Sequence, residues 1–180
     1  MIDSKRLATL KALTVHFETE VSIANGYQHD LAGKVFRGRV RFNTQNDDRF
    51  SVPMLSILED PNPDRFPQRA GGDTDYGLQK DQWVLLVQGW SEDDKINPTD
   101  PAHALMADVK KALAKLVQDS HPVTGALQHP SYMLGGLISG MTMEPGTVRP
   151  PTEQASEDAF FWLRIALQFV EQPNDPYALD

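Results

Sequence analysis

The chain contains no cysteine. Disulfide bridges and cysteine-ligated zinc sites are therefore excluded, which fits the reducing cytoplasm or a particle assembled there. No stretch approaches the roughly 20 apolar residues that a membrane-spanning helix needs. The beginning of the chain also lacks the unbroken apolar run of a secretion signal. We therefore expect a chain that is neither exported nor embedded in a membrane.

The familiar sequence signatures of catalysis are missing as well. The five histidines form no HxxxH or HxH pair, and no serine lies in a GxSxG nucleophile elbow. His103 is expected in the first turn of a helix, where an exposed polar side chain is the simplest interpretation. No glycine-rich phosphate loop accompanies the acidic residues. We expect no cofactor, no metal and no enzymatic activity.

Two acidic stretches are the remaining candidates for a metal site. Asp73 and Asp75 resemble the start of a calcium loop, but the twelfth position of that loop lacks the required glutamate. Glu92, Asp93 and Asp94 could hold magnesium through one or two carboxylates and a phosphate. They could also be the solvated end of a strand, where acids discourage pairing between sheet edges. The second interpretation is favoured.

The length of 180 residues suits one domain with a substantial core. Thirteen prolines and twelve glycines indicate many loops. Residues 61–81 are dense in proline, glycine and aspartate, and a loop of that length is normally functional or disordered. We expect a single domain over residues 1–180, an arm at 61–81 that becomes ordered against a partner, and an extended C-terminal tail at 173–180.

Hydrophobic periodicity predicts the element order α-β-β-β-α-β-β. The second helix, at 100–118, has Asp100 as its expected cap and Pro101 at its first position. Strands grouped apart from helices indicate an α+β fold, with a mixed, largely antiparallel sheet packed against two main helices. The first helix ends near Asn25, and its apolar stripe is Leu7, Leu10, Leu13, Phe17 and Val21.

The predicted strands are 35–42, 52–58, 82–90, 132–146 and 159–172. The first two are expected to be joined by a polar turn. In the fourth, Gly135 and Gly136 predict a bulge or a close backbone approach. The last segment could be a helix, but its strict alternation and its aromatic and β-branched residues favour a strand.

Charge is distributed unevenly along the chain. Residues 1–49 have a balance of +2 and the remainder −10, within a net charge of −8. Arg37, Arg39 and Arg41 would lie on one face of a strand, roughly 6–7 Å apart. Three explanations of this row stay open: a solvated or internally paired face, ion pairs with an acidic neighbour, or a surface that faces nucleic-acid phosphates.

Three stretches together resemble the tail terminator (tail completion) proteins of long-tailed bacteriophages, the lambda-type family. They are VLLVQGW at 84–90, SEDDKINPTDPAHALMADVKKAL at 91–113 and FFWLRIALQFVEQPNDPY at 160–177. The resemblance extends over roughly residues 2–177. It implies a small subunit, with helices on a mixed sheet, that forms a hexameric ring. Such a ring caps the head-proximal end of the tail tube and stops tube polymerisation.

The resemblance implies a structural virion protein with no catalytic residues to carry over. The expected partners are identical subunits, the tail tube protein and a head-completion or neck protein, with DNA passing through the ring. The chain is long for a minimal terminator, and residues 61–81 look like an added arm. Another head–tail joining protein is the alternative, and a metal-dependent enzyme is a third hypothesis. The candidate interface residues are Arg37, Arg39, Arg41, Glu92, Asp93 and Asp94.

Overall fold

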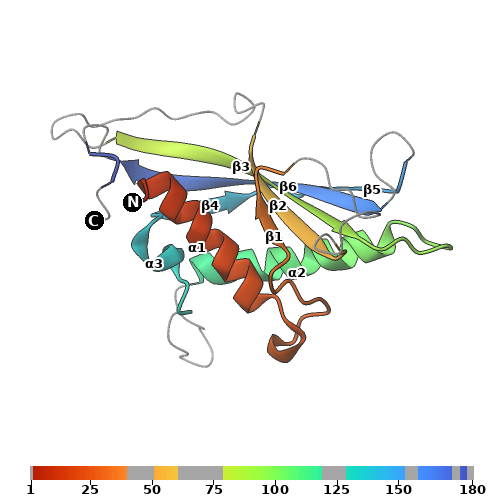
Figure 1. The fold of residues 1–180 in the computed structure, drawn as a ribbon. Helices are drawn as coiled ribbons and strands as arrows, with labels where there is room; N and C mark the ends of the chain where they lie inside the picture. The colour runs from red at the N-terminus through yellow and green to blue at the C-terminus, as the bar shows by residue number, and fades with distance from the viewer. Residues whose placement is uncertain are drawn as a thin grey trace.

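The computed structural model describes residues 2–39, 51–60, 79–118, 129–152, 158–171 and 175–177. Within them, six strands form one mixed sheet, and two long helices, α1 (Lys5–Glu20) and α2 (Asp100–Val117), pack on the same face of it (Figure 1). A short turn of helix, α3 (Met133–Gly136), lies near them. The predicted α+β fold, with a largely antiparallel sheet and two main helices, is confirmed.

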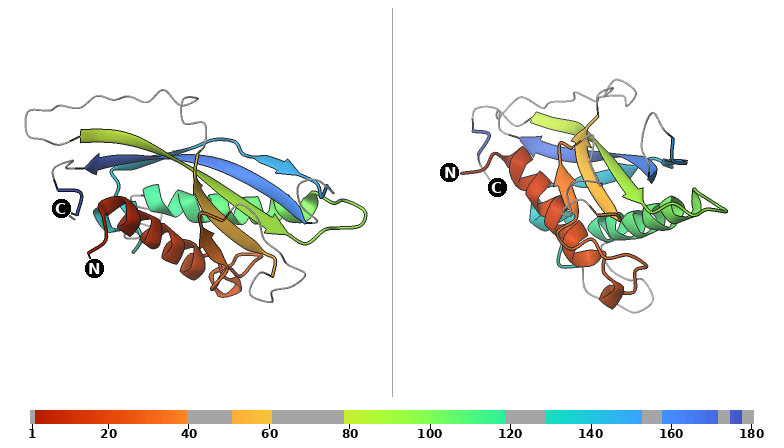
Figure 2. Two further views of the ribbon diagram at one scale, coloured as in Figure 1. Left: turned by 45° about the horizontal axis from the view of Figure 1, so that its top comes forward. Right: turned by 45° about the vertical axis from the view of Figure 1, so that its right-hand side comes forward.

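The sheet is built around its two longest strands, β3 and β6, which pair antiparallel over their whole length. On one side, β2 pairs antiparallel with β3, and β1 pairs parallel with β2 at the edge. On the other side, β4 and β5 both pair with β6 (Figure 2). The strands are β1 (Val35–Arg37), β2 (Met54–Glu59), β3 (Gln79–Ser91), β4 (Gly140–Met143), β5 (Thr147–Arg149) and β6 (Ala159–Glu171).

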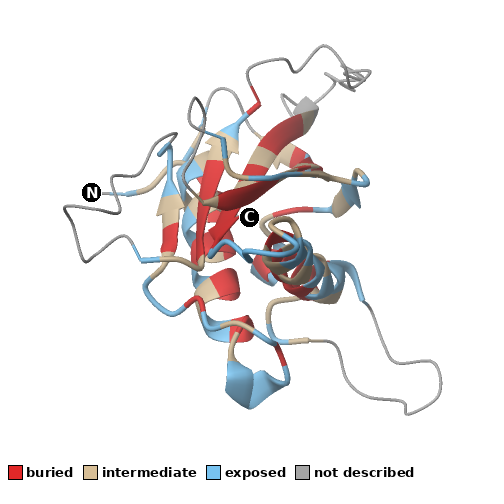
Figure 3. Cartoon of the chain, turned by 90° about the vertical axis from the view of Figure 1, so that its right-hand side faces the viewer, coloured by how far each residue is buried: buried red, intermediate tan, exposed pale blue. Residues whose placement is uncertain are grey.

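The main core fills the space between the helices and the sheet (Figure 3). Each fully buried aliphatic or aromatic side chain there contributes about 1.5–3 kcal/mol of transfer free energy. Successive side chains of a strand point to opposite faces, so β6 supplies every second residue, as its alternation predicts. These residues are Phe161, Leu163, Ile165, Leu167 and Phe169. The stripe of α2 that meets them is Leu105, Val109, Ala112, Leu113 and Leu116.

A smaller apolar cluster lies on the opposite face of the sheet. Met54, Trp90 and Phe160 are cross-strand neighbours there, and all three are buried. Trp162 packs against them and is half-buried, and the guanidinium carbon of Arg149 lies 5.6 Å from its ring centroid. Among the described residues, both long helices lie on the other face, so neither of them covers this cluster.

The first pair of predicted strands is corrected in two respects. Residues 35–42 do not form one strand, because β1 ends at Arg37 and Gly38 adopts a positive φ of 71°. The two strands are also not a hairpin, because β1 and β2 run parallel. Alternation shows which face a side chain occupies, but it carries no information about the direction of the partner strand.

The predicted strand at 132–146 is wrong in its first half. Met133, Leu134, Gly135 and Gly136 all have positive φ values, from 49° to 91°, and form a left-handed turn instead of a bulge in a strand. Strand pairing begins only at Gly140. Further along, β4 and β5 pair with β6 in registers that differ by one residue, so the bulge lies between them.

The predicted apolar stripe of the first helix is confirmed except at its start. Leu13, Phe17 and Val21 are buried and Leu10 packs against the core, but Leu7 is 39 % exposed. The buried face of this helix also includes three polar side chains, Thr9, His16 and Glu20. The helix ends at Glu20, before the predicted position.

The described residues also bear on the predictions for the start of α2, the C-terminal tail and the arm. The cap of α2 is Thr99, without a side-chain hydrogen bond, and Asp100 is the first helical residue. The amide of Lys5 donates to the carbonyl of Pro176 at 2.9 Å, so this part of the predicted tail contacts the start of α1. Most of the predicted arm, 61–78, lies outside the described residues, and its last three residues begin β3. No described helix is both long and apolar enough to span a membrane.

Candidate functional site

The acidic cluster follows the end of β3, and all three carboxylates are exposed. The Oδ1 atom of Asp94 accepts hydrogen bonds from the amides of Asn97 at 2.7 Å and Ile96 at 2.8 Å. These two bonds stabilise the charged form and lower the pKa of the Asp94 carboxyl. The cluster therefore ends a strand and shapes the turn before α2, as the favoured interpretation of the sequence predicts.

The predicted arginine row is not a single face of a strand. Arg37 ends β1, and Arg39 is exposed beyond the left-handed Gly38. Arg41 lies outside the described residues, as do Asp73 and Asp75. In the sheet register Arg37 is level with the middle of β3, whereas the acidic cluster lies beyond its end. The fold places these two sets of charges at different parts of the subunit.

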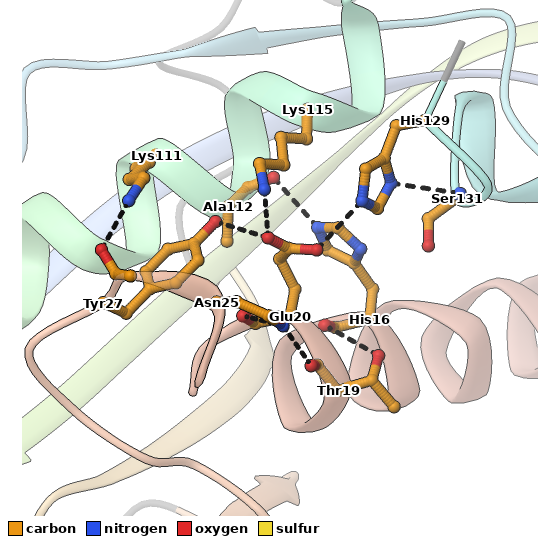
Figure 4. A network of polar contacts seen from close by, with 11 residues as sticks. His16, Thr19, Glu20, Asn25, Tyr27, Lys111, Ala112, Lys115, His129 and Ser131 are labelled. Atoms are coloured by element: carbon orange, nitrogen blue, oxygen red, sulfur yellow. Dashed lines mark hydrogen bonds and ion pairs between the residues drawn. The ribbon is translucent and has the colours of Figure 1, made fainter. Parts of the chain in front are cut away.

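A largely buried polar network is centred on Glu20, at the end of α1 (Figure 4). Its side chain is 7 % exposed. One carboxylate oxygen accepts from the hydroxyl of Tyr27 at 2.8 Å and from the ammonium of Lys115, on α2. The other accepts from Nε2 of His129 at 2.9 Å. A single carboxylate thus joins α1, α2 and the two segments that follow these helices.

Two histidines lie side by side in this network. Nε2–H of His16 donates to the carbonyl of Ala112 at 2.9 Å, and its buried Nδ1 has no hydrogen-bond partner among the described residues. The ring of His129 meets the His16 ring edge-on, with centroids 5.8 Å apart. Nδ1 of His129 accepts from the amide of Ser131 at 3.2 Å, so the proton of a neutral His129 is on Nε2, which faces Glu20.

The pKa shifts follow from these contacts. Burial lowers the pKa of His16 and outweighs its bond to the Ala112 carbonyl. Burial alone would raise the pKa of Glu20, but hydrogen bonds from Lys115 and Tyr27 and the charge of Lys115 outweigh it and lower the pKa. Burial, together with Glu20, raises the pKa of Tyr27. At neutral pH the network therefore holds an ionised Glu20, a neutral His16 and a protonated Tyr27.

A second set of contacts fixes the loop after α1 onto α2. Oδ2 of Asp108 accepts from the amides of Gln28 and His29 at 2.9 and 3.1 Å, and from Nδ1 of His29 at 2.7 Å. The ammonium of Lys111 donates to the carbonyl of Gly26 at 2.8 Å and lies 4.0 Å from the Tyr27 ring centroid. Asp108 and Lys111 therefore hold the loop after α1 against α2.

The network around Glu20 was not predicted from the sequence. A weak signal was present, because Glu20 lies three residues after Phe17 and His16 three residues after Leu13, on the buried side of the helix. The exposed position of His103 is confirmed. Among the described residues, no three histidine, aspartate or glutamate side chains are arranged to hold a metal ion.

Comparison with known proteins adds no relative: the chain matches no protein-family model and no curated protein.

Proposed function

We propose that this protein is a tail terminator, a structural subunit whose hexameric ring caps the head-proximal end of a bacteriophage tail tube. The observation that carries the proposal is the layout of the fold. A mixed sheet with both long helices on one face agrees with what the resemblance of 84–113 and 160–177 implies for this family. The ring acts by steric means, because one side docks on the last tube ring and the other side accepts no further tube subunit.

The charge distribution supports assembly into a ring. Arg37 and Arg39 are exposed at and beyond the end of edge strand β1, and the acidic cluster is exposed beyond the end of β3. Opposite charges at separate parts of one subunit suit a head-to-tail contact, and a contact of this kind can close into a ring. In the proposed ring, the arginines of one subunit meet the acidic cluster of the next.

Charge reversal tests this contact. The variant Asp93→Lys is expected to raise the protein concentration needed for ring formation by at least about tenfold, because it places like charges together. The variant Arg37→Glu should have the same effect for the same reason. The double variant should recover much of the loss. The measurement is particle mass by light scattering, where the wild type should reach six 20.1-kDa subunits.

Glu18→Lys, on α1, is the matched control and should assemble like the wild type. Asp94 is left unchanged because it shapes its own turn. A double variant no better than either single variant would place the contact elsewhere. A wild type that stays monomeric at every concentration, and also with tail tubes present, would contradict the ring itself.

A further inference from the structure

The Glu20 network joins three parts of the chain that are far apart in sequence. It includes α1 through His16 and Glu20, α2 through Lys115, and the segment that begins at His129 and leads into α3 (Figure 4). Tyr27 adds an uncharged hydroxyl. At neutral pH one carboxylate faces one ammonium, and the buried His16 imidazole is neutral.

Protonation would give each histidine an Nδ1–H that no described group accepts. His16 is 2 % exposed, and no acceptor for its Nδ1–H lies among the described residues. A proton on Nδ1 of His129 would face the amide N–H of Ser131, which now donates to that atom. Protonation of His16 would thus leave a buried donor unpaired among the described residues. Protonation of His129 would break the hydrogen bond from the Ser131 amide, which closes the turn after His129.

Acid also changes the charge balance of the whole network. With both rings protonated, three cations would surround one carboxylate, with the ring centroids only 5.8 Å apart. Burial lowers the pKa of His16 from 6.5, so the unfolded chain takes up this proton first and the folded state loses stability as the pH falls below 6.5. Glu20 adds a further loss below its ordinary value of 4.5, because its pKa is lowered too.

The segment that follows His129 is under backbone strain. Met133 and Leu134 have φ values of 49° and 52°, in the left-handed region that side chains with a Cβ rarely occupy. Leu134 is held there by burial in the main core. Ile138, at the end of the segment, is buried in the same core, and at its start His129 contacts Glu20 and Ser131. Strain of this kind persists only while the surrounding structure enforces it.

We propose that His16, His129 and Glu20 form an acid-sensitive clasp, which keeps the α1–α2–α3 junction closed at neutral pH and releases residues 129–138 when both histidines are protonated. The clasp goes beyond the ring-forming function and does not rest on it. Release frees the left-handed turn to relax and exposes Leu134 and Ile138, which are 5 % and 3 % exposed in the closed form.

Amide hydrogen exchange of the full chain tests the clasp. Between about pH 7.5 and about pH 5.5, we expect the amides of Leu134, Gly135 and Ile138 to lose protection by at least about tenfold, after correction for the intrinsic rate. The amides of β6 should keep theirs over the same range. Equal protection of residues 129–138 at both pH values would overturn the proposal without any variant.

Glutamine variants separate the clasp from general acid sensitivity. His129→Gln and the double variant His16→Gln/His129→Gln keep polar groups that cannot become charged in this range. We expect a reduced acid response in the first and a response below about twofold in the second. His103→Gln, on the exposed first turn of α2, is the matched control and should respond like the wild type.

If the double variant does not fold, His129→Gln decides, since the His129 side chain is 25 % exposed and tolerates replacement more readily. A full acid response in the glutamine variants, or its loss in His103→Gln, would assign the opening to other groups and overturn the clasp.

Discussion

Replacing Glu20 by alanine is expected to lower the free energy of unfolding by about 3 kcal/mol. The change leaves the buried hydroxyl of Tyr27 and the Nε2–H of His129 without an acceptor, and it removes the counter-charge of Lys115. The value is at the lower end of the range for a broken buried ion pair, because the Lys115 side chain is 30 % exposed and can turn to solvent. Urea denaturation at fixed protein concentration measures the loss.

Two further variants divide this effect into its parts. Glu20→Gln keeps one acceptor oxygen, whereas the alanine variant keeps none, so the glutamine variant should lose less stability. Glu18→Ala, two residues away and less buried, is the matched control and should change the free energy by no more than about 0.5 kcal/mol. A loss below about 1 kcal/mol for Glu20→Ala would mean that the network does not hold the helices together.

Replacing Gly89 by alanine is expected to cost about 1–3 kcal/mol through overpacking. Gly89 lies in β3 between its cross-strand partners Leu55 and Phe161, and the Phe161 ring covers the glycine. A Cβ at position 89 would lie 2.3 Å from a ring carbon of Phe161 and 2.8 Å from a methyl group of Leu55. Both neighbours are fully buried, so neither can turn away without disturbing the core.

A smaller partner should relieve this clash. Phe161→Leu alone leaves a cavity and destabilises the protein, but combined with Gly89→Ala it should give a favourable coupling of about 1 kcal/mol or more in a double-mutant cycle. Leu163→Val, on the same face of β6 but two residues away, is the control and should add its cost independently. Simple additivity of Gly89→Ala and Phe161→Leu would show that the ring does not set the space at position 89.

How far the sequence predicts the fold depends on how local the cause is. The alternation in 159–172 and the stripe in 100–118 predict β6 and α2 well, because the residues that form each pattern also form the core. The parallel pairing of β1 with β2 was missed, since period-2 alternation is the same in either direction. The left-handed turn at Met133–Gly136 was missed because an apolar run with glycines is equally typical of a bulged strand.

The network around Glu20 could not be predicted for a different reason. Lys115 and His129 are 95 and 109 positions away in the chain, so the groups that compensate its burial are invisible in any local pattern. The end of a strand before Glu92–Asp94 was predicted because its cause is local, as is the turn that follows, where Asp94 accepts from amides two and three residues ahead. The prediction that the arginines share one face of a strand was wrong from Gly38 onward, where the backbone leaves the strand.

Imaging of tail tubes with the added protein tests the terminator proposal most directly. Tube subunits that polymerise in the presence of the protein should give tubes that stop growing, with ring-shaped density at one end only, while the Asp93→Lys variant should leave tubes uncapped. Tubes that grow to the same length and carry no end density would contradict the proposal. Density that binds isolated heads instead would favour a neck protein.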